Sequence, residues 1–396
     1  MTTDLHPSRN QSASTEAGSP PAHLQTTGHS CVIGPYHPML PVPMRLSLSL
    51  RPSSDGGLPG WGVEIASAQV ELGYSRIGLE ERVAEGRLEW GRALELVEGI
   101  CACCSQANTL ALVHAVEAMA KFIVPPRAAY LRMVLAEIER VISHLSNAAA
   151  TMQALGLTHI ETVLRDLRER LVQAVADWSG ARTRPALITY GGLVRNIDDA
   201  LCRALALAVR HIERALRAHV IAATANRELA ARLVGLGVIT AQEAVIAGLR
   251  GPVLRASGIP FDIRASWPTG AYEEEGVTIV TQRAGDAFAR LMVRLLECLE
   301  SLRIIEQALD DLPGGSVKAR GSPELREGSG IGRVEGPRGE VFCWVRGGPD
   351  GPRALHLSAP SLPNLGVVAG LMRGRKFEDI HLLLLSLDLC ISSAER

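Results

Sequence analysis

The stretch "VPPRAAYLRMVLAEIERVISHL", residues 124–145, decides the fold class. Pro125 and Pro126 mark a helix start, because proline fits well in the first turn of a helix. Six apolar residues then recur at helical spacing: Leu131, Val134, Leu135, Ile138, Ile142 and Leu145. This stripe predicts a long helix with one face in a core. Glu137 and His144 lie on a flank about 120° from the stripe. Their position favours a hydrogen-bonded pair at a helix interface, with a proton-relay role for a buried histidine as the alternative.

The rest of the interior is also helical. A second long helix is predicted in residues 285–315, where Leu-Pro-Gly-Gly supplies a C-terminal stop. Further helices are predicted near residues 88–122, 161–179 and 198–232. Short alternating or β-rich runs, "RLSLSL", "GEVFCWV" and "RALHLSA", occur only towards the two ends of the chain. The sequence therefore predicts a mainly α protein with one domain over residues 31–396. A central helical bundle (86–315) is flanked by a small α/β region (31–85) and a mixed C-terminal region (316–396).

Composition excludes several classes of protein. Of the 396 residues, 47% are hydrophobic, which is ample for a large core. Lys plus Arg number 41 and Asp plus Glu 42, so charge gives no argument for binding nucleic acid or an anionic membrane surface. Residues 1–30 have no hydrophobic periodicity and no signal-peptide pattern, and we expect a disordered tail there. The apolar run at residues 380–392 is shorter than the ~20 residues of a membrane span. We therefore expect a cytoplasmic protein that reaches a membrane only through partner subunits.

Three thiols stand close together in "EGICACCSQANT", residues 98–109, where Cys101 and Cys104 have C-x-x-C spacing and Cys103 lies between them. Two thiolates so spaced at a helix start can bind one metal ion. A thioredoxin-like site would need a βαβ context, which the preceding residues do not offer. A structural zinc site needs four ligands, and the one further convincing donor is Cys390, in the terminal "SLDLCISSAER". The remaining cysteines are interpreted as small buried hydrophobes: Cys31, Cys202, Cys298 and Cys343.

Six separated segments resemble a single family. They are "IGPYHP" (33–38), "LGYSRIGLEERVAEGRLEWGRALELVEGICACC" (72–104), "VPPRAAYLRMVLAEIERVISHL" (124–145), "GLRGPVLRASGIPFDIR" (248–264), "VEGPRGE" (334–340) and "SLDLCISSAER" (386–396). In this order they resemble the large subunit of membrane-bound, group 4 nickel-iron hydrogenases and its counterpart in respiratory complex I (NADH-quinone oxidoreductase), the quinone-site subunit. The resemblance covers nearly the whole chain after the tail.

The resemblance implies a metal site with a degenerate set of ligands. Hydrogenases of this kind hold nickel and iron through two C-x-x-C pairs, each giving one terminal and one bridging thiolate. Cys101 and Cys104 match the first pair. Cys390 matches the terminal ligand of the second pair, whereas Ser393 stands at the second bridging position, and a serine hydroxyl is a harder donor that stays protonated near neutral pH. Four other residues depart from the hydrogenase pattern. Val42 stands in place of a proton-delivering glutamate, Gly99 in place of an arginine, Asn108 in place of a histidine, and Leu389 in place of the proline of Asp-Pro-Cys.

The quinone-site subunit of complex I is matched only in part. Its site uses a tyrosine and an N-terminal histidine; His37 is retained, but no tyrosine occurs between Glu98 and Cys104. Arg338 matches an arginine that lies over the metal in hydrogenases. Its guanidinium is either a fixed positive charge over a reacting centre or the anchor of a structural salt bridge. Arg338 and His37 are the candidate catalytic residues, and Asp388 is expected to position the C-terminal segment.

The implied function is that of the large redox subunit of a membrane-associated oxidoreductase complex, peripheral on the inner face of the cell membrane. Electrons would pass from an iron-sulfur cluster in a partner to quinone or another acceptor, since this chain carries no four-cysteine cluster motif. The implied partners are a small iron-sulfur subunit, a protein like the 30-kDa subunit of complex I and antiporter-like membrane subunits, with no nucleic acid. Two alternatives stay open: a functional nickel-iron hydrogenase subunit, and a non-catalytic structural or coupling subunit.

Overall fold

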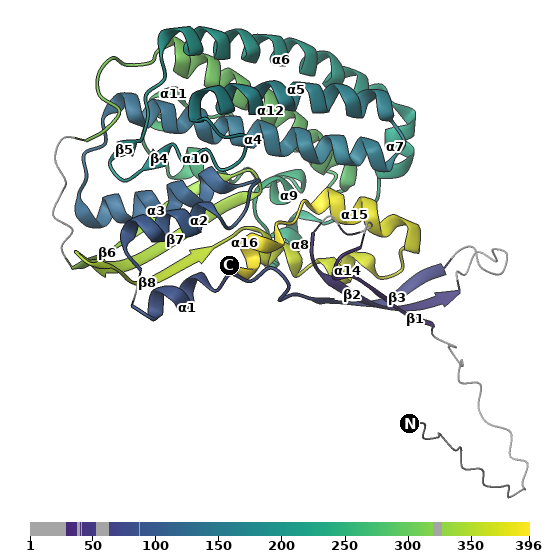
Figure 1. The fold of residues 1–396 in the computed structure, drawn as a ribbon. Helices are drawn as coiled ribbons and strands as arrows, with labels where there is room; N and C mark the ends of the chain where they lie inside the picture. Colours follow the sequence, from purple (N-terminus) through teal and green to yellow (C-terminus); the bar gives the residue numbers. More distant parts are fainter. Residues whose placement is uncertain (1–28, 38–39, 41, 53–62, 87, 320–326) are drawn as a thin grey trace, which may run out of the picture.

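Four long helices dominate the structure, a computed structural model that describes residues 29–37, 40, 42–52, 63–86, 88–319 and 327–396. They are α4 (Pro126–Ala154), α5 (Thr158–Ser179), α6 (Asp199–Ala225) and α12 (Ala287–Asp310). Helix α4 packs against α5 and α12, and α6 packs against both of these, so the four form the bundle at the top of Figure 1. Residues 1–28 of the tail expected over residues 1–30 lie outside the described residues, and the first strand begins at His29.

The helix starts follow from the sequence. Helix α4 begins at Pro126, and the six apolar positions predicted to face the core are buried, apart from the half-buried Ile142. Asp198 and Asp286 cap α6 and α12, because their side chains accept the backbone N–H groups of the first turn. Short elements connect the long helices: β4 (Ile188–Thr189), β5 (Gly192–Leu193), α7 (Arg227–Leu233), α8 (Ala241–Ile246), α9 (Gly251–Ala256), α10 (Ile263–Ser266) and α11 (Tyr272–Glu275).

The N-terminal part contains an antiparallel sheet in the order β1-β2-β3 and three helices. Their bounds are β1 (His29–Ile33), β2 (Arg45–Pro52), β3 (Val63–Glu71), α1 (Leu79–Ala84), α2 (Trp90–Glu98) and α3 (Ser105–Ala120). The helical region predicted near residues 88–122 is thus divided in two by the loop that carries Cys101 and Cys103. This division lets the loop project its sulfurs away from both helix axes.

The C-terminal part returns the chain to the start of the bundle. It comprises β6 (Gly328–Gly336), β7 (Gly339–Gly348), β8 (Gly351–Ser358), α13 (Ser361–Leu365), α14 (Val368–Met372), a 3-10 turn (Phe377–Asp379), α15 (Ile380–Leu387) and α16 (Ile391–Glu395). Helix α3 lies directly on β6, because a Cβ on Gly330 or Gly332 would stand 2.0 Å from a carbonyl oxygen of α3. Figure 1 shows α16 and the C-terminus beside this part of the fold. The mainly α fold with small β regions at both ends is confirmed.

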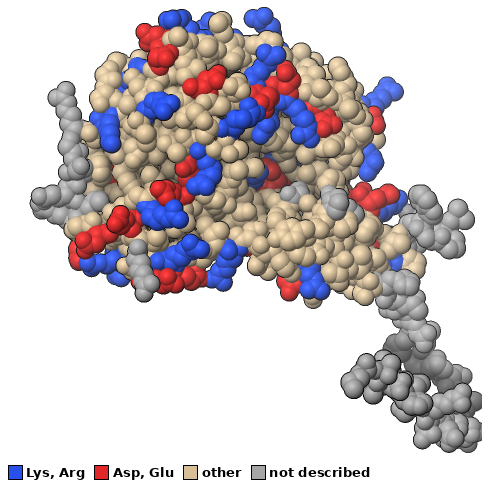
Figure 2. Space-filling view, in the orientation of Figure 1, with Lys and Arg blue, Asp and Glu red and all other residues tan. Residues whose placement is uncertain are grey.

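The surface and the helices agree with the composition. Figure 2 shows acidic and basic residues interspersed over the visible face, as the near-equal numbers of the two charges would suggest. Among the described residues, no helix combines the length and the hydrophobicity that crossing a bilayer requires.

Candidate functional site

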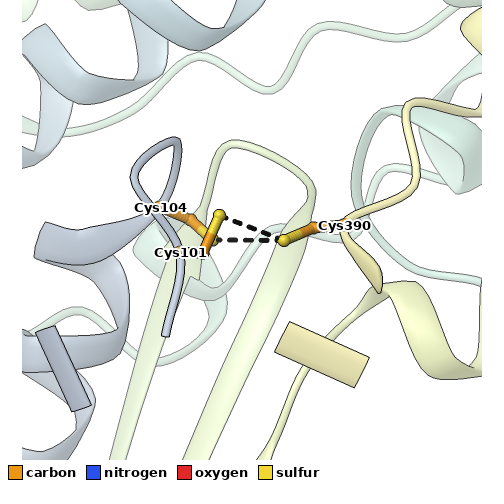
Figure 3. A group of neighbouring side chains, drawn as sticks. All are labelled: Cys101, Cys104 and Cys390. Carbon is orange, nitrogen blue, oxygen red and sulfur yellow. Dashed lines mark hydrogen bonds between the residues drawn. The ribbon is translucent and has the colours of Figure 1, made fainter. Parts of the chain in front are cut away.

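The loop between α2 and α3 presents two sulfurs on one side. The backbone N–H of Cys103 lies 3.3 Å from Sγ of Cys101, which fixes the turn. Cys104 is the N-cap residue of α3, yet its side chain makes no capping hydrogen bond. Its sulfur therefore points away from the helix end and towards the C-terminal segment (Figure 3).

The C-terminal segment is held in place by several side chains. Asp388 ends α15 in the left-handed conformation, with φ of 52°, which aspartate tolerates better than most residues. The backbone N–H of Cys390 donates to Oγ of Ser361 at 2.8 Å. Glu395 accepts backbone N–H groups of the turn at residues 73–75, including that of Tyr74 at 3.3 Å. These bonds tie the last residues to distant parts of the chain.

Three sulfurs meet between the two segments and form what we call the thiol cluster, Cys101, Cys104 and Cys390. Sγ of Cys390 lies 3.1 Å from Sγ of Cys101 and 3.8 Å from Sγ of Cys104, as Figure 3 shows. All three sulfurs are within 4.8 Å of one another. Oγ of Ser393 completes the group, 3.2 Å from the sulfur of Cys104 and 3.1 Å from that of Cys390. The structure thus brings together the three predicted sulfur donors and the serine.

The donor set is three sulfurs and one hydroxyl. Such a set matches the number of ligands that a single tetrahedral ion takes, although sulfur and nitrogen are the usual donors at structural zinc. The nickel-iron centre implied by the resemblance needs two bridging thiolates, and the hydroxyl of Ser393 stays protonated near neutral pH. The residues present therefore do not fit that binuclear centre.

The thiols differ in burial and in pKa. Cys104 and Cys390 are buried, Cys101 is half-buried and Cys103 is exposed. Hydrogen bonds from Cys101 and Cys104 lower the pKa of Cys390 well below its usual value, and Arg338 lowers it further. A hydrogen bond with Cys101 lowers the pKa of Cys103 to about 6, although partial burial opposes the change. The cluster therefore holds one negative charge readily, and a second thiolate forms beside it at the surface.

Arg338 joins the C-terminal segment to the cluster. Its Nε donates to the carbonyl oxygen of Asp388 at 2.8 Å, and its Nη2 donates to Oδ1 of the same residue at 2.9 Å. Burial opposes the charge of Arg338, but Asp388 and the nearby sulfurs raise its pKa well above the usual value. Arg338 thus forms the salt bridge of one sequence interpretation, and it also lines the same cavity as Cys101 and Cys390.

A cavity of about 380 Å³ opens beside the thiol cluster. It lies between α4, the N-terminal loop and the C-terminal segment, and its lining includes Val42, Cys101, Asn147, Arg338, Leu385 and Asp388. Through Val42, the N-terminal loop contributes an apolar side chain to this cavity. His37 is exposed and is not among the described residues that line this cavity, so its catalytic assignment stays a prediction.

Glu137 and His144 lie, fully buried, where α4 faces α12. They are hydrogen-bonded, but to separate partners: Glu137 to Arg140, Arg264, Tyr272 and Ser301, and His144 to Glu297 at 3.0 Å. Burial lowers the pKa of His144 to about 4. Burial raises the pKa of Glu137, but the neighbouring arginines outweigh it and bring the pKa down to about 2. These buried bonds support a structural role for both residues.

Sequence reasoning missed Glu139. Its carboxylate, 8% exposed, accepts the backbone N–H of Gln106 at 2.7 Å and of Ala107 at 3.0 Å, and so caps α3 in place of Cys104. Ser143, one turn further along α4, is also buried. The available signal was a carboxylate directly beside a predicted core position, Ile138.

For the other cysteines the prediction of small buried hydrophobes is confirmed at Cys298 and Cys343, which are fully buried, while Cys31 and Cys202 are partly exposed.

Comparison with known proteins places the chain among respiratory subunits. Residues 155–327 and 319–396 match the family described as the 49 kDa subunit of the respiratory-chain NADH dehydrogenase. The chain is 32% identical to a subunit of the F(420)H(2) dehydrogenase of Methanosarcina mazei, over 92% of this chain and 96% of that one. It is 31% identical to the alpha subunit of the membrane-bound hydrogenase of Pyrococcus furiosus, over 92% and 86%. A chain in the solved structure of the membrane-bound sulfane sulfur reductase, an archaeal respiratory membrane complex, superposes with a TM-score of 0.84 at 27% identity, covering 95% of this chain and 100% of that chain.

Proposed function

The chain belongs to the family of the 49 kDa subunit of the respiratory-chain NADH dehydrogenase, and on this basis we propose that its thiol cluster is itself the redox centre of a membrane-attached complex. The resemblance to group 4 hydrogenases and to the quinone-site subunit of complex I is confirmed, and so is the expectation of an oxidoreductase subunit. In the proposed chemistry, electrons arrive from an iron-sulfur cluster of a partner and leave through a dithiol–disulfide couple.

One observation carries the proposal, the 3.1 Å separation of the Cys101 and Cys390 sulfurs. A disulfide bond is about 2.05 Å long, so a movement of about 1 Å joins the two sulfurs. The two residues are 289 positions apart in the chain, so their approach needs the whole fold. A pair held this way exchanges two electrons in each cycle, together with at least one proton, because Cys390 readily stays a thiolate.

A compound with a sulfane sulfur, written R–S–S–R′ in which R itself is attached through a sulfur (R = R″–S), suits this couple as the electron acceptor. A thiolate of the Cys101–Cys390 pair attacks one sulfur, forms a mixed disulfide and releases R–S⁻. The second cysteine then closes the Cys101–Cys390 disulfide and releases R′–S⁻. Two electrons from the iron-sulfur partner and at least one proton restore the reduced pair. Arg338 lies beside the cluster with a fixed positive charge that stabilises the thiolates.

Two features support this acceptor over quinone. The structural neighbour that matches over nearly the whole chain is described as a sulfane sulfur reductase. The cavity beside the cluster has no tyrosine among its described lining residues, whereas the quinone site of the complex I counterpart uses one. The remaining parts of the proposal follow the family: a small iron-sulfur subunit, a protein like the 30-kDa subunit of complex I, antiporter-like membrane subunits, and a place on the inner face of the membrane.

The test uses the complete complex, purified through a tag on this chain, with reduced methyl viologen as the electron donor. Dimethyl trisulfide, menadione and protons are offered as separate acceptors, and metals are measured on the same sample. We expect thiol formation from the trisulfide, lost in Cys101→Ser and Cys390→Ser but kept in Cys202→Ser, a thiol on α6 outside the cluster. Stoichiometric nickel with hydrogen formation would overturn the proposal in favour of a hydrogenase. Turnover that survives in both Cys101→Ser and Cys390→Ser would show that the cluster has a structural role and no redox role.

A further inference from the structure

Glu139 and Ser143 lie one turn apart on α4. They are on the side of this helix that faces the loop between α2 and α3, which carries Cys101 and Cys103 and is called the thiol loop below. We propose that they form a proton route between solvent and the thiol cluster. The inference rests on the proposed function, because a thiol–disulfide couple takes up protons when it is reduced. Among the described residues of the N-terminal loop, the one that lines the cavity is Val42, which carries no carboxylate.

The route begins in a second cavity, of about 140 Å³, on the far side of the thiol loop. Glu139 lines this cavity together with Arg168 of α5 and with Arg182 and Arg184 of the loop that follows. A space of this size holds several water molecules, and the charged and hydroxyl groups around it offer them hydrogen bonds. Water held along the polar side of this cavity would carry protons from the surface as far as Glu139.

The second cavity and the cavity beside the thiols share one wall. Four residues line both: Ala102, Cys103, Ser143 and Ser146. Oγ of Ser146 is engaged, since it donates to the carbonyl oxygen of Ile142 at 2.6 Å and accepts from Arg168 at 3.0 Å. Ser143 is 3% exposed, and its Oγ has no hydrogen-bond partner among the described residues. A hydroxyl both donates and accepts, so the Ser143 side chain can pass a proton from one cavity to the other.

Glu139 can hold the proton that Ser143 passes on. Burial raises the pKa of Glu139 to about 7, although the backbone N–H groups of Gln106 and Ala107 and the hydroxyl of Ser105 act in the opposite direction. The charged and titratable groups around it are Cys103 from the thiol loop, Arg168 from α5, and Arg182 and Arg184 from the following loop. Because both protonation states are populated near neutral pH, Glu139 can take up and release protons in each cycle.

A purely structural role is the alternative, since Glu139 also caps α3. Ser143→Ala separates the two, because removing an unpartnered buried hydroxyl costs the fold little. Ser146→Ala is the matched control: it lies in the same wall of the same helix, but its hydroxyl is already engaged. Glu139→Gln keeps the size of the side chain and removes its proton.

Two measurements on the purified complex test the route. The first is the exchange of the buried S–H group of Cys104 into D2O, followed by its S–H stretching band, which is isolated by subtracting the spectrum of Cys104→Ser. The second is the solvent isotope effect on trisulfide turnover. We expect Ser143→Ala and Glu139→Gln to slow exchange about a hundredfold and to raise the isotope effect. Ser146→Ala should leave both quantities unchanged, and Ser143→Ala should keep the thermal midpoint.

The outcomes separate the route from the proposed function. Slowed exchange in a complex that does not reduce the trisulfide supports the route and rejects the sulfur chemistry. Normal exchange and a normal isotope effect in Ser143→Ala overturn the route, even where trisulfide reduction is present. Equal losses in Ser143→Ala and Ser146→Ala also overturn it, because they would report damage to the wall rather than loss of a proton carrier.

Discussion

The sulfurs of Cys101 and Cys390 lie 3.1 Å apart, although one belongs to the loop after α2 and the other to the last turns of the chain. Cys390 stands slightly further from Cys104, at 3.8 Å. The C-terminal segment is therefore placed to form a bond with Cys101 before any other thiol of the cluster.

Oxidation of the purified chain by diamide should link Cys101 to Cys390. The bond closes a very long loop, and constraint of the unfolded chain should raise the free energy of unfolding by about 2–4 kcal/mol. Peptide mapping by mass spectrometry identifies the linked pair, and urea unfolding measures the gain. Cys390→Ser should show neither effect, whereas Cys202→Ser should show both. A dominant link that includes Cys103 would contradict this geometry.

Replacing Arg338 should destabilise the C-terminal segment. Its two hydrogen bonds to Asp388 join side chains that are 12% and 9% exposed, so Arg338→Met leaves a carboxylate almost buried without its main partner. We expect a loss of about 3 kcal/mol in the free energy of unfolding. Arg353→Met serves as the control, because its pair with Glu327 has side chains 56% and 68% exposed and contributes little. Equal losses in the two variants would show that Arg338 does not anchor the segment.

The free energy of unfolding should depend on the protonation of His144 between about pH 4 and 6.5. Burial lowers the pKa of His144 to about 4, against an unperturbed value of 6.5. The unfolded chain therefore binds more protons than the folded chain in this window, and stability falls as the pH is lowered through it. At pH 5 the loss from this residue should be about 2 kcal/mol.

His144→Gln tests this pH effect. The amide keeps a hydrogen bond to Glu297 and does not titrate, so the variant should lose less stability than the wild type between pH 7 and about 5. Urea unfolding at the two pH values measures the difference. The same comparison in His219→Gln, a partly buried histidine on α6 bonded to the carbonyl oxygen of Ala215, gives the background. Parallel pH profiles for wild type and His144→Gln would show that His144 is not neutral in the folded state.

Gly332 should tolerate no side chain. A Cβ there would lie 2.0 Å from the carbonyl oxygen of Ala111, so Gly332→Ala must push α3 away from β6. We expect a loss of several kcal/mol, which thermal unfolding would reveal, together with weaker oxidation of the Cys101–Cys390 pair. Gly91→Ala in α2 is the matched control, since nothing lies within 4 Å of its added Cβ, and alanine should stabilise the helix by about 0.5–1 kcal/mol. Unchanged thermal midpoints in Gly332→Ala would mean that α3 and β6 are not held this closely.

Local patterns predicted most of the fold. The stripe from Leu131 to Leu145 gave α4 its core face, and the alternation in "GEVFCWV" marked β7, because these periods depend only on which residues face a core. The thiols were predicted at a helix start, and α3 does begin at Ser105, but the end of α2 at Glu98 was not predicted. Two partners were also beyond local reasoning: Arg264, which pairs with Glu137, and Glu297, which pairs with His144, come from segments more than a hundred positions away.

The sequence by itself determined the family, the mainly α architecture and the identity of the sulfur donors, because periodicity and motif spacing are local properties of the chain. Only the tertiary structure decided that Cys390 reaches Cys101, that Arg338 joins Asp388, and that Ser143 lies in the wall between two cavities. The physical reason is that each contact depends on packing between segments remote in the chain, above all α3 on β6 and the C-terminal segment on the turn at residues 73–75. Spacing along a sequence carries no information about such distances.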